Sequence, residues 1–599
     1  MVDAAWIPDD DVIAHANLTA LMRRRDVPDL SSLHRWSTEH RADFWATVID
    51  ELGIVFDRPP ERILGSDDPE HPGWLAGARM NIVSSVFAAV PPDAPAVLLR
   101  RHGRTETVTY RQLEVSVARF AAAFAAAGWQ PGDRVAIAME MNLESVVAYL
   151  GIVAAGGVVV SIADSFAPEE IRTRLDITDP VAIVTQDVVH RAGRILPMYD
   201  KIVAADAPAA IVVGSEARLR SGDVRWDTAT AGTDLAAAPV MREPAAHTNV
   251  LFSSGTTGVP KAIPWTQTTP IKAAMDGRYH QDIHPGDVVA WPTNLGWMMG
   301  PWLIYASLLN GAAFALYDDA PTTRGFCEFV AESGVTMLGV VPSIVTAWRA
   351  NGTLDEVDLS RVRVLSSTGE ASNPDDYRWL MERAAAPVIE YCGGTEIGGG
   401  YISGTVLEPA VPSTFTTPTL GLDIRILDDA GRPADEGEVF LVPPSIGMST
   451  ELLNGDHHGV YFAGVPVADV PLRRHGDRMR RLPDGRYRAE GRIDDTMNLG
   501  GIKVSSAEIE RVVSAVDGVT ETAAVAVAPR GGGPDQLVVF AVPDGDVDPD
   551  VLRARMQQAI RRDLNPLFKV GAVHLIDTLP RTASHKVMRR VLRDRLSSR

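Results

Sequence analysis

Helical stretches with one apolar face alternate with short apolar runs along most of this chain. The segment from Tyr110 to Met139 shows the order clearly: an alanine-rich amphipathic stretch, a turn at residues 131–133, and then an apolar run. The same order recurs in "GIVAAGGVVVSI", "SLLNGAAFALY" and "ESGVTMLGVVP". Helices that alternate with short buried strands predict a wound sheet covered on both faces.

The pattern changes near residue 420, where apolar and polar positions begin to alternate. Residues 420–442 surround the turn "DDAG" and predict an antiparallel hairpin region, and a second hairpin turns at Pro483–Gly485. After Arg492 comes a short α/β segment whose helix opens on a capping box, Ser505-x-x-Glu508. We therefore predict an α/β fold: a large N-terminal region of wound sheets plus a small β-barrel-like part, followed by a small mobile α+β C-terminal domain.

With 599 residues, the chain is longer than the stretch that a single hydrophobic core usually organises, so we expect more than one folding unit. Residues 1–80 are polar and punctuated by Trp and Pro, and we expect them to pack as an extension on a large domain of residues 81–493. The boundary is placed at Arg492–Asp495, which leaves residues 494–599 as a C-terminal domain small enough to move as a unit.

Composition narrows the class of protein. A hydrophobic content of 46% with 22% charged residues is typical of a soluble globular protein. The formal charge of −20 argues against general nucleic-acid binding, which needs a basic face, so any anionic ligand must be held by local positive charge. Cys327 and Cys392 lack metal-ligand spacing and are expected to be reduced thiols, with a single disulfide as the alternative.

No segment favours secretion or membrane insertion. The acidic N-terminus lacks the basic-then-apolar order of a signal peptide. The apolar stretch Val146–Ala163 carries glycines and predicts a buried helix, turn and strand instead of a membrane span. We expect a cytoplasmic protein with no membrane partner.

The densest candidate chemistry lies in "SSGTTGVPK", Ser253–Lys261. Its glycines let backbone amides point inward, its hydroxyls add donors, and Lys261 adds a cation. Together they could cradle a polyphosphate, with a hydroxyl left over for Mg²⁺. Gly258 is followed by Val-Pro-Lys, so the spacing of a Walker A loop is absent. A flexible surface loop is the alternative for this segment taken alone.

Two further loops follow apolar strands: "STGEASNPDD" from Ser367 and "EYCGGTEIGGG" from Glu390. Such loops line the ligand crevice of a wound sheet. Thr395 and Glu396 suit contact with phosphate and Mg²⁺, although a surface salt bridge is the alternative for Glu396. Asp477 in "HGD" could accept both hydroxyls of a ribose. The basic tail around Lys586 begins an amphipathic helix, or is a solvated basic face.

These segments, in this order, resemble the adenylate-forming superfamily of acyl-CoA synthetases, carrier-domain adenylation domains and firefly luciferase. The matching motifs are "SSGTTGVPK", "GGTE", "HGD", "GRIDD" with "GGIKVSSAEIE", and "PRTASHKVMRR". Within the superfamily the chain resembles the acetyl-CoA synthetase branch, and "SSTGEASNPDDYRWLM" resembles plant peroxisomal acyl-activating enzymes. The resemblance covers nearly everything from about residue 73 onward.

The resemblance implies the reaction and the residue roles. A carboxylate attacks the α-phosphate of ATP to give an acyl-AMP and pyrophosphate, and CoA then displaces AMP. Lys586 would bridge carboxylate and α-phosphate, Thr257 and Glu396 would position Mg²⁺, and the small domain would pivot at Asp494. The β- and γ-phosphates would contact Ser253, Ser254, Gly255, Thr256, Thr257, Gly258 and Lys261, the α-phosphate would contact Thr395, and the adenine would contact Gly369, Glu370 and Ala371. Asp477 would bind the ribose and Arg492 the ribose or a phosphate, while Gly500, Gly501 and Lys503 would border the pantetheine tunnel. The resemblance implies that Lys586, Glu396, Thr257 and Arg492 are the catalytic residues.

The chain departs from the family pattern at the adenine slot, at His585 of the lysine motif, where glycine is common, and in the acyl pocket. Many relatives have an aromatic residue three positions before the motif threonine, but here Cys392 stands there and the ring is at Tyr391, so either could cover the adenine. Acetyl-specific relatives have a tryptophan where this chain has Gly393, so the freed volume must be filled by substrate or by neighbours. We expect an acid larger than acetate, in a pocket lined by Trp297, Met298, Met299, Thr368 and Gly393.

The sequence leaves the acceptor and the oligomeric state open. Transfer to CoA is favoured, with a carrier-protein thiol, an amine or another nucleophile as the alternative. A non-catalytic nucleotide-binding protein is disfavoured, because Lys586, Glu396 and Asp477 are all present. The expected partners are a small carboxylic acid, ATP, Mg²⁺ and CoA; a homo-oligomer stays open.

Overall fold

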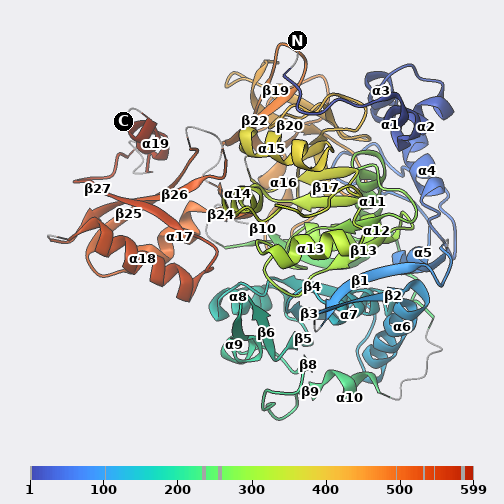
Figure 1. Cartoon of the computed structure of the whole chain (residues 1–599), viewed down its shortest axis with the longest axis horizontal. Helices are drawn as coiled ribbons and strands as arrows, with labels where there is room; N and C mark the ends of the chain where they lie inside the picture. Colours follow the sequence, from blue (N-terminus) through green and yellow to red (C-terminus); the bar gives the residue numbers. More distant parts are fainter. Residues whose placement is uncertain are drawn as a thin grey trace.

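The computed structural model describes residues 3–88, 90–101, 103–231, 238–253, 259–370, 372–493, 496–529, 533–545, 547–581 and 587–597. Four short helices near the N-terminus pack against the large body of the molecule (Figure 1). Phe44 and Trp45 of the fourth helix are fully buried in the largest hydrophobic core. The four helices are α1 (Asp10–His15), α2 (Asn17–Arg25), α3 (Leu30–Glu39) and α4 (Arg41–Glu51).

Two large sheets form the body of the molecule. The first has nine strands in the order β18-β17-β16-β15-β14-β12-β13-β1-β2. Its central pairs, from β16 to β1, are parallel, and its edges are antiparallel. The strands are β1 (Pro95–Arg101), β2 (Arg104–Thr109), β12 (Val288–Ala290), β13 (Ala313–Leu316), β14 (Met337–Val340), β15 (Val364–Ser367), β16 (Val388–Gly394), β17 (Gly399–Ser403) and β18 (Thr417–Pro418).

The second sheet has seven strands in the order β11-β10-β4-β3-β5-β8-β9. All its pairs are parallel except β10 with β11. Its strands are β3 (Arg134–Ala138), β4 (Val158–Ile162), β5 (Ala182–Gln186), β8 (Ala210–Val213), β9 (Val224–Arg225), β10 (His247–Ser253) and β11 (Lys261–Thr266), and a small hairpin, β6 (Val188–Arg191) with β7 (Arg194–Pro197), lies beside it.

Helices cover these sheets, as the alternating pattern predicted. Every residue of α12 is buried, so this helix lies inside the core shared by the two sheets. The stretch Val146–Ala163 is a buried helix, a turn and a strand, which confirms that prediction. The helices are α5 (Ile82–Ala88), α6 (Tyr110–Ala126), α7 (Leu143–Ala154), α8 (Pro168–Thr178), α9 (Met198–Ala204), α10 (Trp226–Thr230), α11 (Thr269–Tyr279), α12 (Met299–Leu308), α13 (Arg324–Glu332), α14 (Pro342–Asn351) and α15 (Pro374–Ala384). Among the described helices, none is both long and apolar enough to cross a bilayer.

The change of pattern near residue 420 marks an antiparallel sheet. Strands β19 (Asp423–Leu427), β20 (Glu436–Val442), β21 (Arg473–Arg481) and β22 (Tyr487–Arg492) pair in that order, with α16 (His457–Tyr461) inserted before β21. Both predicted hairpins are present. The small β part is thus a four-stranded antiparallel sheet, and the predicted α/β fold class is confirmed.

The C-terminal part, residues 496–597, has its own core of strands and helices. It projects from the body on the left of Figure 1, and its α18 contacts α8. The predicted capping box at Ser505 and Glu508 is formed at the start of α17. The elements are β23 (Thr496–Leu499), β24 (Ile502–Ser505), α17 (Ser506–Val513), β25 (Val519–Val527), β26 (Gln536–Pro543), α18 (Pro549–Asp563), β27 (Val570–Leu575) and α19 (Arg589–Ser597).

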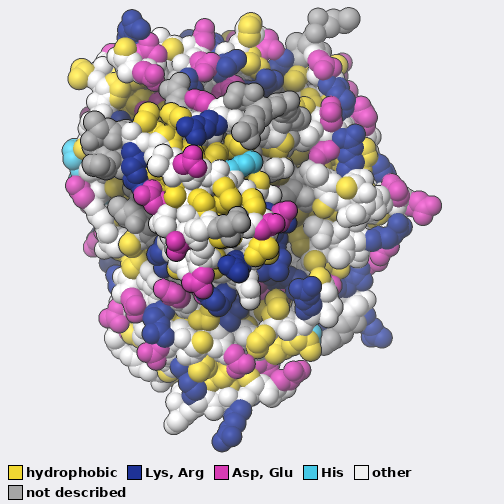
Figure 2. Space-filling model, turned by 90° about the vertical axis from the view of Figure 1, so that its left-hand side faces the viewer, with side chains coloured by type: hydrophobic (Ala, Val, Ile, Leu, Met, Phe, Trp, Pro, Cys, Tyr) yellow, Lys and Arg dark blue, Asp and Glu magenta, His cyan; other side chains and the backbone are white. Residues whose placement is uncertain are grey.

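Charge is distributed unevenly over the surface. Although the chain carries a formal charge of −20, Lys and Arg side chains gather near the middle of the face shown in Figure 2, which is the left-hand side of Figure 1. Local positive charge of this kind attracts anions that the net charge would repel. Cys327 and Cys392 are both free thiols, which confirms the prediction that they are not paired.

Candidate active site

The loops predicted to line the crevice do meet at the carboxyl ends of the first sheet. Residues 294–299 follow β12, residues 368–370 follow β15, and Thr395 and Glu396 follow β16. Because β12, β14, β15 and β16 are neighbouring parallel strands, their carboxyl ends lie side by side. The segments that follow these strands therefore lie near one another, and their role as the walls of a ligand crevice stays a prediction.

The hairpin of β16 with β17 differs from the predicted loop. Strand β16 continues to Gly394, and Gly393 and Gly394 pair with Gly400 and Gly399 of β17. A Cβ at Gly393 would lie 2.0 Å from the carbonyl oxygen of Gly399. Only glycine allows two backbones to approach this closely, so the glycine-rich sequence forms a tight hairpin where an open loop was expected.

Alternation along β16 separates the two candidates for the adenine contact. Tyr391 points into the core, where its hydroxyl donates to Asp276 Oδ2 at 2.6 Å, and its side chain is buried. Cys392 points to the other side and lies 3.5 Å from Asp477 Oδ2. In this arrangement Cys392 belongs to the site, and the Tyr391 ring is enclosed by protein.

Strand β21 supplies a polar row that faces the same space. Arg473, His475 and Asp477 alternate along the strand and therefore share one face. Asp477 Oδ2 accepts from the Tyr401 hydroxyl at 2.8 Å and lies 3.1 Å from His475 Nε2. Asp477 is also opposite Arg492 in the pairing of β21 with β22. The predicted ribose carboxylate is thus held in a fixed orientation.

Glu396 lies at the centre of a positively charged environment. Its carboxylate is 3.5 Å from His475 Nδ1, and it is buried. Burial alone would raise the pKa of Glu396, but the charges of Lys503, His475 and Lys261 outweigh this effect and lower the pKa to about 2. The carboxylate is therefore ionised at neutral pH, the form that can bind a hard cation such as Mg²⁺.

Strands β10 and β11 form the stem of the predicted phosphate loop. Ser253 and Lys261 are opposite each other at its base. Asn454 fixes the base, because its amide donates to the Pro260 carbonyl at 2.8 Å and accepts from the Ala262 amide at 2.9 Å. Of the predicted site residues, Ser254, Gly255, Thr256, Thr257, Gly258, Ala371, Asp494 and Lys586 lie outside the described residues, and Arg492 is described only in its main chain.

The C-terminal part reaches this site through the turn between β23 and β24. Gly369 has a φ of +95°, and a Cβ there would lie 3.4 Å from Gly501 Cα, so the two glycines let two backbones meet. Glu370 accepts from the Ser343 amide at 2.9 Å, and burial raises its pKa. Lys503, on β24, acts on Glu396 as described above. The structure therefore brings the predicted adenine segment and the predicted tunnel segment together.

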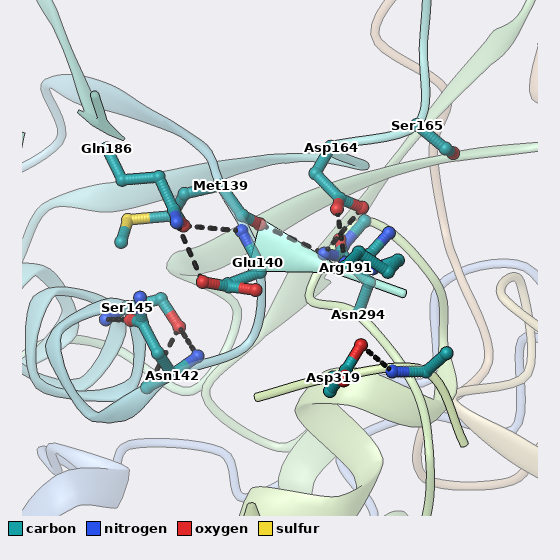
Figure 3. Close-up of polar contacts among 12 residues, drawn as sticks. Met139, Glu140, Asn142, Ser145, Asp164, Ser165, Gln186, Arg191, Asn294 and Asp319 are labelled. Carbon is teal, nitrogen blue, oxygen red and sulfur yellow. Dashed lines mark hydrogen bonds and ion pairs between the residues drawn. The ribbon is translucent and has the colours of Figure 1, made fainter. Parts of the chain in front are cut away.

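The predicted acyl wall is positioned by a polar cluster at the carboxyl ends of β3, β4 and β5 (Figure 3). Asn294 donates to the Met139 carbonyl at 2.9 Å and to Asp164 Oδ1 at 3.2 Å, and so ties the loop after β12 to the second sheet. This loop carries Trp297 and Met298, and Met299 begins α12. Thr368 is half-buried at the end of β15.

The place beside Gly393 is filled by neighbouring backbone. Besides the Gly399 carbonyl, Gly400 Cα would lie 2.8 Å from a Cβ at Gly393. The volume freed by the missing indole was expected to be filled either by substrate or by neighbouring residues. In the structure, neighbouring residues occupy the space next to the glycine. An indole cannot stand at position 393 while β16 and β17 pair in this way.

Several residues of the site were missed by sequence reasoning. Arg473 donates to the Glu396 carbonyl at 3.2 Å and to Ser449 Oγ at 2.7 Å, and its guanidinium lies 4.3 Å from the centre of the Tyr461 ring. Alternation with Asp477 along "RRHGD" could have identified Arg473 and His475. Ser449 and Tyr461 follow a long irregular segment, and no local pattern points to them.

Comparison with known proteins identifies relatives over the whole chain. The sequence profile of the AMP-binding enzyme family matches residues 85–448, that of the AMP-binding enzyme C-terminal domain matches residues 508–586, and that of the acetyl-coenzyme A synthetase N-terminus matches residues 30–86. The profiles thus follow the order of the motifs.

Among curated proteins, the chain is 47% identical to the probable acyl-activating enzyme 17, peroxisomal, of Arabidopsis thaliana, covering 99% of this chain and 88% of that protein. It is 45% identical to the hexanoyl-CoA synthase of Cannabis sativa, with the same coverage of 99% and 88%. Identity to the acetyl-coenzyme A synthetase of Photobacterium profundum is 28%, over 87% of this chain and 84% of that enzyme.

Among solved structures, the acetoacetyl-CoA synthetase from Streptomyces lividans superposes with a TM-score of 0.78 at 28% identity, covering 98% of this chain and 95% of that one. The resemblance found from the motifs is therefore confirmed in sequence and in fold.

Proposed function

The chain belongs to the family of AMP-binding enzymes and is an acyl-CoA synthetase, an acid–thiol ligase that uses ATP and CoA; from this premise we propose that its acid is larger than acetate and that the residues gathered above carry the reaction. The observation that carries the proposal is the convergence of Glu396, Asp477 and Lys261: His475 lies within 3.5 Å of both carboxylates, and the charge of Lys261 lowers the pKa of Glu396.

In the first step, the substrate carboxylate oxygen attacks the α-phosphorus of ATP. The new O–P bond gives the acyl-adenylate, and the bond to the β-phosphate breaks, so pyrophosphate leaves with the electron pair. Two anions meet in this step, so offsetting negative charge is the main catalytic task. Lys261 would bind the β- and γ-phosphates, Thr395 the α-phosphate, and Asp477 the ribose hydroxyls.

The carboxylate of Glu396 fits a magnesium site, because it stays ionised among positive groups that a polyphosphate would share. Glu396 and Thr257 would hold Mg²⁺, which would neutralise phosphate charge when bound. Lys586 would bridge the attacking carboxylate and the α-phosphate.

In the second step, the sulfur of CoA attacks the acyl carbon and the bond to AMP breaks. We propose that residues 494–599 move as a unit about Asp494 between the two steps, and that the turn at Gly500–Lys503 borders the thiol path in the second. The contact of Gly501 with Gly369 supports this placement, since it brings that turn to the edge of the site.

The size of the acid is proposed on two grounds. Met298 and Met299 can line pockets of varied shape, because methionine is unbranched and flexible. The higher identity to a hexanoyl-CoA synthase than to an acetyl-coenzyme A synthetase agrees with this preference.

The test is adenylation across a library of carboxylic acids, with hydroxylamine trapping the acyl-adenylate, followed by CoA-dependent release of AMP. The expected result is a best kcat/KM for an acid longer than acetate; acetate as the best substrate would contradict the size proposal. Lys586→Ala should abolish adenylation while largely sparing transfer from supplied acyl-AMP. Asp494→Pro should do the reverse, stalling thioester formation only.

Two further expectations belong to the proposal. A cytoplasmic location is tested by cell fractionation, with the peroxisome as the alternative suggested by the name of the Arabidopsis relative. The absence of nucleic-acid binding and the oligomeric state are tested by gel shift and by light scattering.

A further inference from the structure

The loop between β4 and α8 joins the C-terminal part to the body of the molecule. Asp164 belongs to the body: its carboxylate binds Arg191 at 2.8 Å and accepts from Asn294 (Figure 3). The next residue, Ser165, faces the C-terminal part, and its hydroxyl oxygen lies 3.3 Å from the Asn565 amide nitrogen. The Ala167 amide donates to the Leu564 carbonyl at 3.1 Å. Adjacent residues are thus fixed to opposite sides of one interface.

The first turn of α8 adds an ion pair across the interface. Arg511 of α17 donates to Glu170 Oε1 at 2.6 Å and lies 3.5 Å from Glu169. Glu170 also binds Arg174 at 2.9 Å, and only 3% of its side chain is exposed. A carboxylate that shares two guanidinium groups in a buried position is held in one orientation, so it offers Arg511 a fixed partner.

An aromatic contact continues the same interface. The Phe166 ring is 5.4 Å from the Trp297 ring, and the Arg174 guanidinium lies 3.8 Å from the centre of the Phe166 ring. Trp297 packs against the core of the second sheet and also against the core of the C-terminal part. A residue expected to line the acyl pocket therefore lies where the two parts meet.

The interface is directly connected to the turn that enters the site. Strand β24 ends at Ser505, and α17 starts at Ser506 with the capping box of Ser505 and Glu508. Arg511 lies on that short helix, so its position fixes the orientation of Lys503 and Gly501 relative to the body. Contacts at Arg511 and Asn565 thereby favour the arrangement in which Gly501 meets Gly369.

We propose that Arg511 and Asn565 are positioning residues for the thioester step: together with Glu170 and Ser165 they form a latch that holds the C-terminal part with the Gly500–Lys503 turn in the site. This inference rests on the proposed function, because it assigns the arrangement seen here to the second half-reaction. Neither residue touches a reacting atom; both act through the turn.

Variants of these residues should slow thioester formation without slowing adenylation. Arg511→Glu places like charges at the interface, and Asn565→Ala removes the hydrogen bond to Ser165. Each variant should slow transfer from supplied acyl-AMP to CoA by about ten-fold, the change expected for the loss of one charged or buried contact. Adenylation, followed by pyrophosphate exchange, should be unchanged, and Arg511→Lys should restore most of the transfer rate.

Arg553→Glu is the matched control. Arg553 is as exposed as Arg511 (43% against 45% of the side chain) and pairs with Asp550 near the start of α18, whereas Leu564 and Asn565 follow the other end of that helix. It should alter neither half-reaction. An equal loss of both half-reactions in Arg511→Glu, or no change in the transfer rate, would overturn the latch.

A second readout does not depend on catalysis. The Ala167 amide should exchange its hydrogen faster in Arg511→Glu and in Asn565→Ala than in the parent chain or in Arg553→Glu, because its acceptor is the Leu564 carbonyl across the interface. Unchanged exchange would refute the latch even if the chain proved inactive with every acid tested. Failure of adenylation in the parent chain, with faster exchange in the variants, would instead refute only the proposed function.

Discussion

The two sides of strand β16 carry similar residue types and have different roles. On the core side, Tyr391, Asp276 and Lys272 form a closed set: the Lys272 ammonium is 2.6 Å from Asp276 Oδ1, and Asp276 Oδ2 accepts from Tyr391 and from the Gly400 amide. Both members of the ion pair are fully buried. The two charges of this set are therefore neutralised by each other.

On the site side, charges of one sign predominate. Glu396 is surrounded by His475, Lys261 and Lys503, which lower its pKa to about 2 against the opposing effect of burial. His475 lies 3.1 Å from Asp477 and 3.5 Å from Glu396, and both distances are longer than the 2.6 Å between Lys272 and Asp276 on the core side. A surplus of positive groups around one carboxylate suits a polyphosphate, whereas a closed ion pair suits a core.

The largest effect is expected when the buried ion pair of Lys272 and Asp276 is removed. Asp276→Asn leaves the Lys272 charge buried without a carboxylate, so the free energy of unfolding should fall by about 3–5 kcal/mol. Chemical denaturation measures the loss. A fall of less than about 1 kcal/mol would show that the pair is not a closed unit, since surface pairs have effects of that size.

Glu396→Gln tests the site side with a substitution of the same kind. Pyrophosphate exchange should fall by at least about a hundred-fold, as for loss of one preorganised electrostatic group. The free energy of unfolding should change much less than in Asp276→Asn, because Lys261 and Lys503 are only half-buried and can be hydrated. A loss of stability equal to that of Asp276→Asn, with exchange retained, would reverse the assignment of the two sides.

Gly393→Ala acts on the strand that separates the two sides. A Cβ placed 2.0 Å from the Gly399 carbonyl oxygen must push β16 and β17 apart. We expect a loss of about 1–3 kcal/mol in the free energy of unfolding, the usual cost of forcing one group into packed structure. A thermal shift of the purified variant measures this loss. Gly485→Ala, in the hairpin turn of β21 and β22, is the control: its positive φ gives backbone strain, but an added Cβ meets no atom within 4 Å. Unchanged melting of Gly393→Ala would contradict the close pairing.

Glu140 provides a contrast with Glu396, because it is a half-buried carboxyl with fewer positive neighbours. Burial raises its pKa from 4.5 to about 7, although the hydrogen bond from Gln186 and the charge of Arg191 oppose the rise. The folded chain thus keeps a proton that the unfolded chain releases between these values, so stability from this group is present at low pH and is lost as the pH rises through about 7.

The isosteric variant Glu140→Gln removes this dependence. Relative to the parent chain, its free energy of unfolding should rise with pH from about 4.5 to about 7, by at most about 1.4 kcal/mol per pH unit, and then level off. Urea denaturation of both chains at several pH values measures the difference. A difference independent of pH would mean that Glu140 is ionised throughout.

Sequence reasoning located the fold class and both hairpins because these depend on local patterns: alternation of helix and strand, and turn residues such as those at Pro483–Gly485. It also placed Asp477 and Glu396 in one site. It could not choose between Tyr391 and Cys392, because the register of β16 against β17, fixed by glycine pairs, decides which side chain faces the crevice.

The contacts across the interface were equally hidden from sequence. Arg511 and Glu170 are distant in the chain, and each stands in an ordinary amphipathic helix, so neither has a local signal. Their meeting depends on how two separately folded parts dock. Long-range docking of this kind is decided by the complete three-dimensional surface, which no motif encodes.

The most direct test of the account is the affinity for a non-hydrolysable acyl-adenylate analogue, measured by calorimetry on Asp477→Asn and Tyr391→Phe. These residues lie on opposite sides of β16, and each variant removes hydrogen-bonding capacity. The account predicts that Asp477→Asn weakens binding at least about ten-fold with little change in melting, whereas Tyr391→Phe lowers the melting temperature and leaves affinity within about two-fold. Equal affinity in Asp477→Asn and the parent chain, or weakened binding in Tyr391→Phe alone, would contradict it.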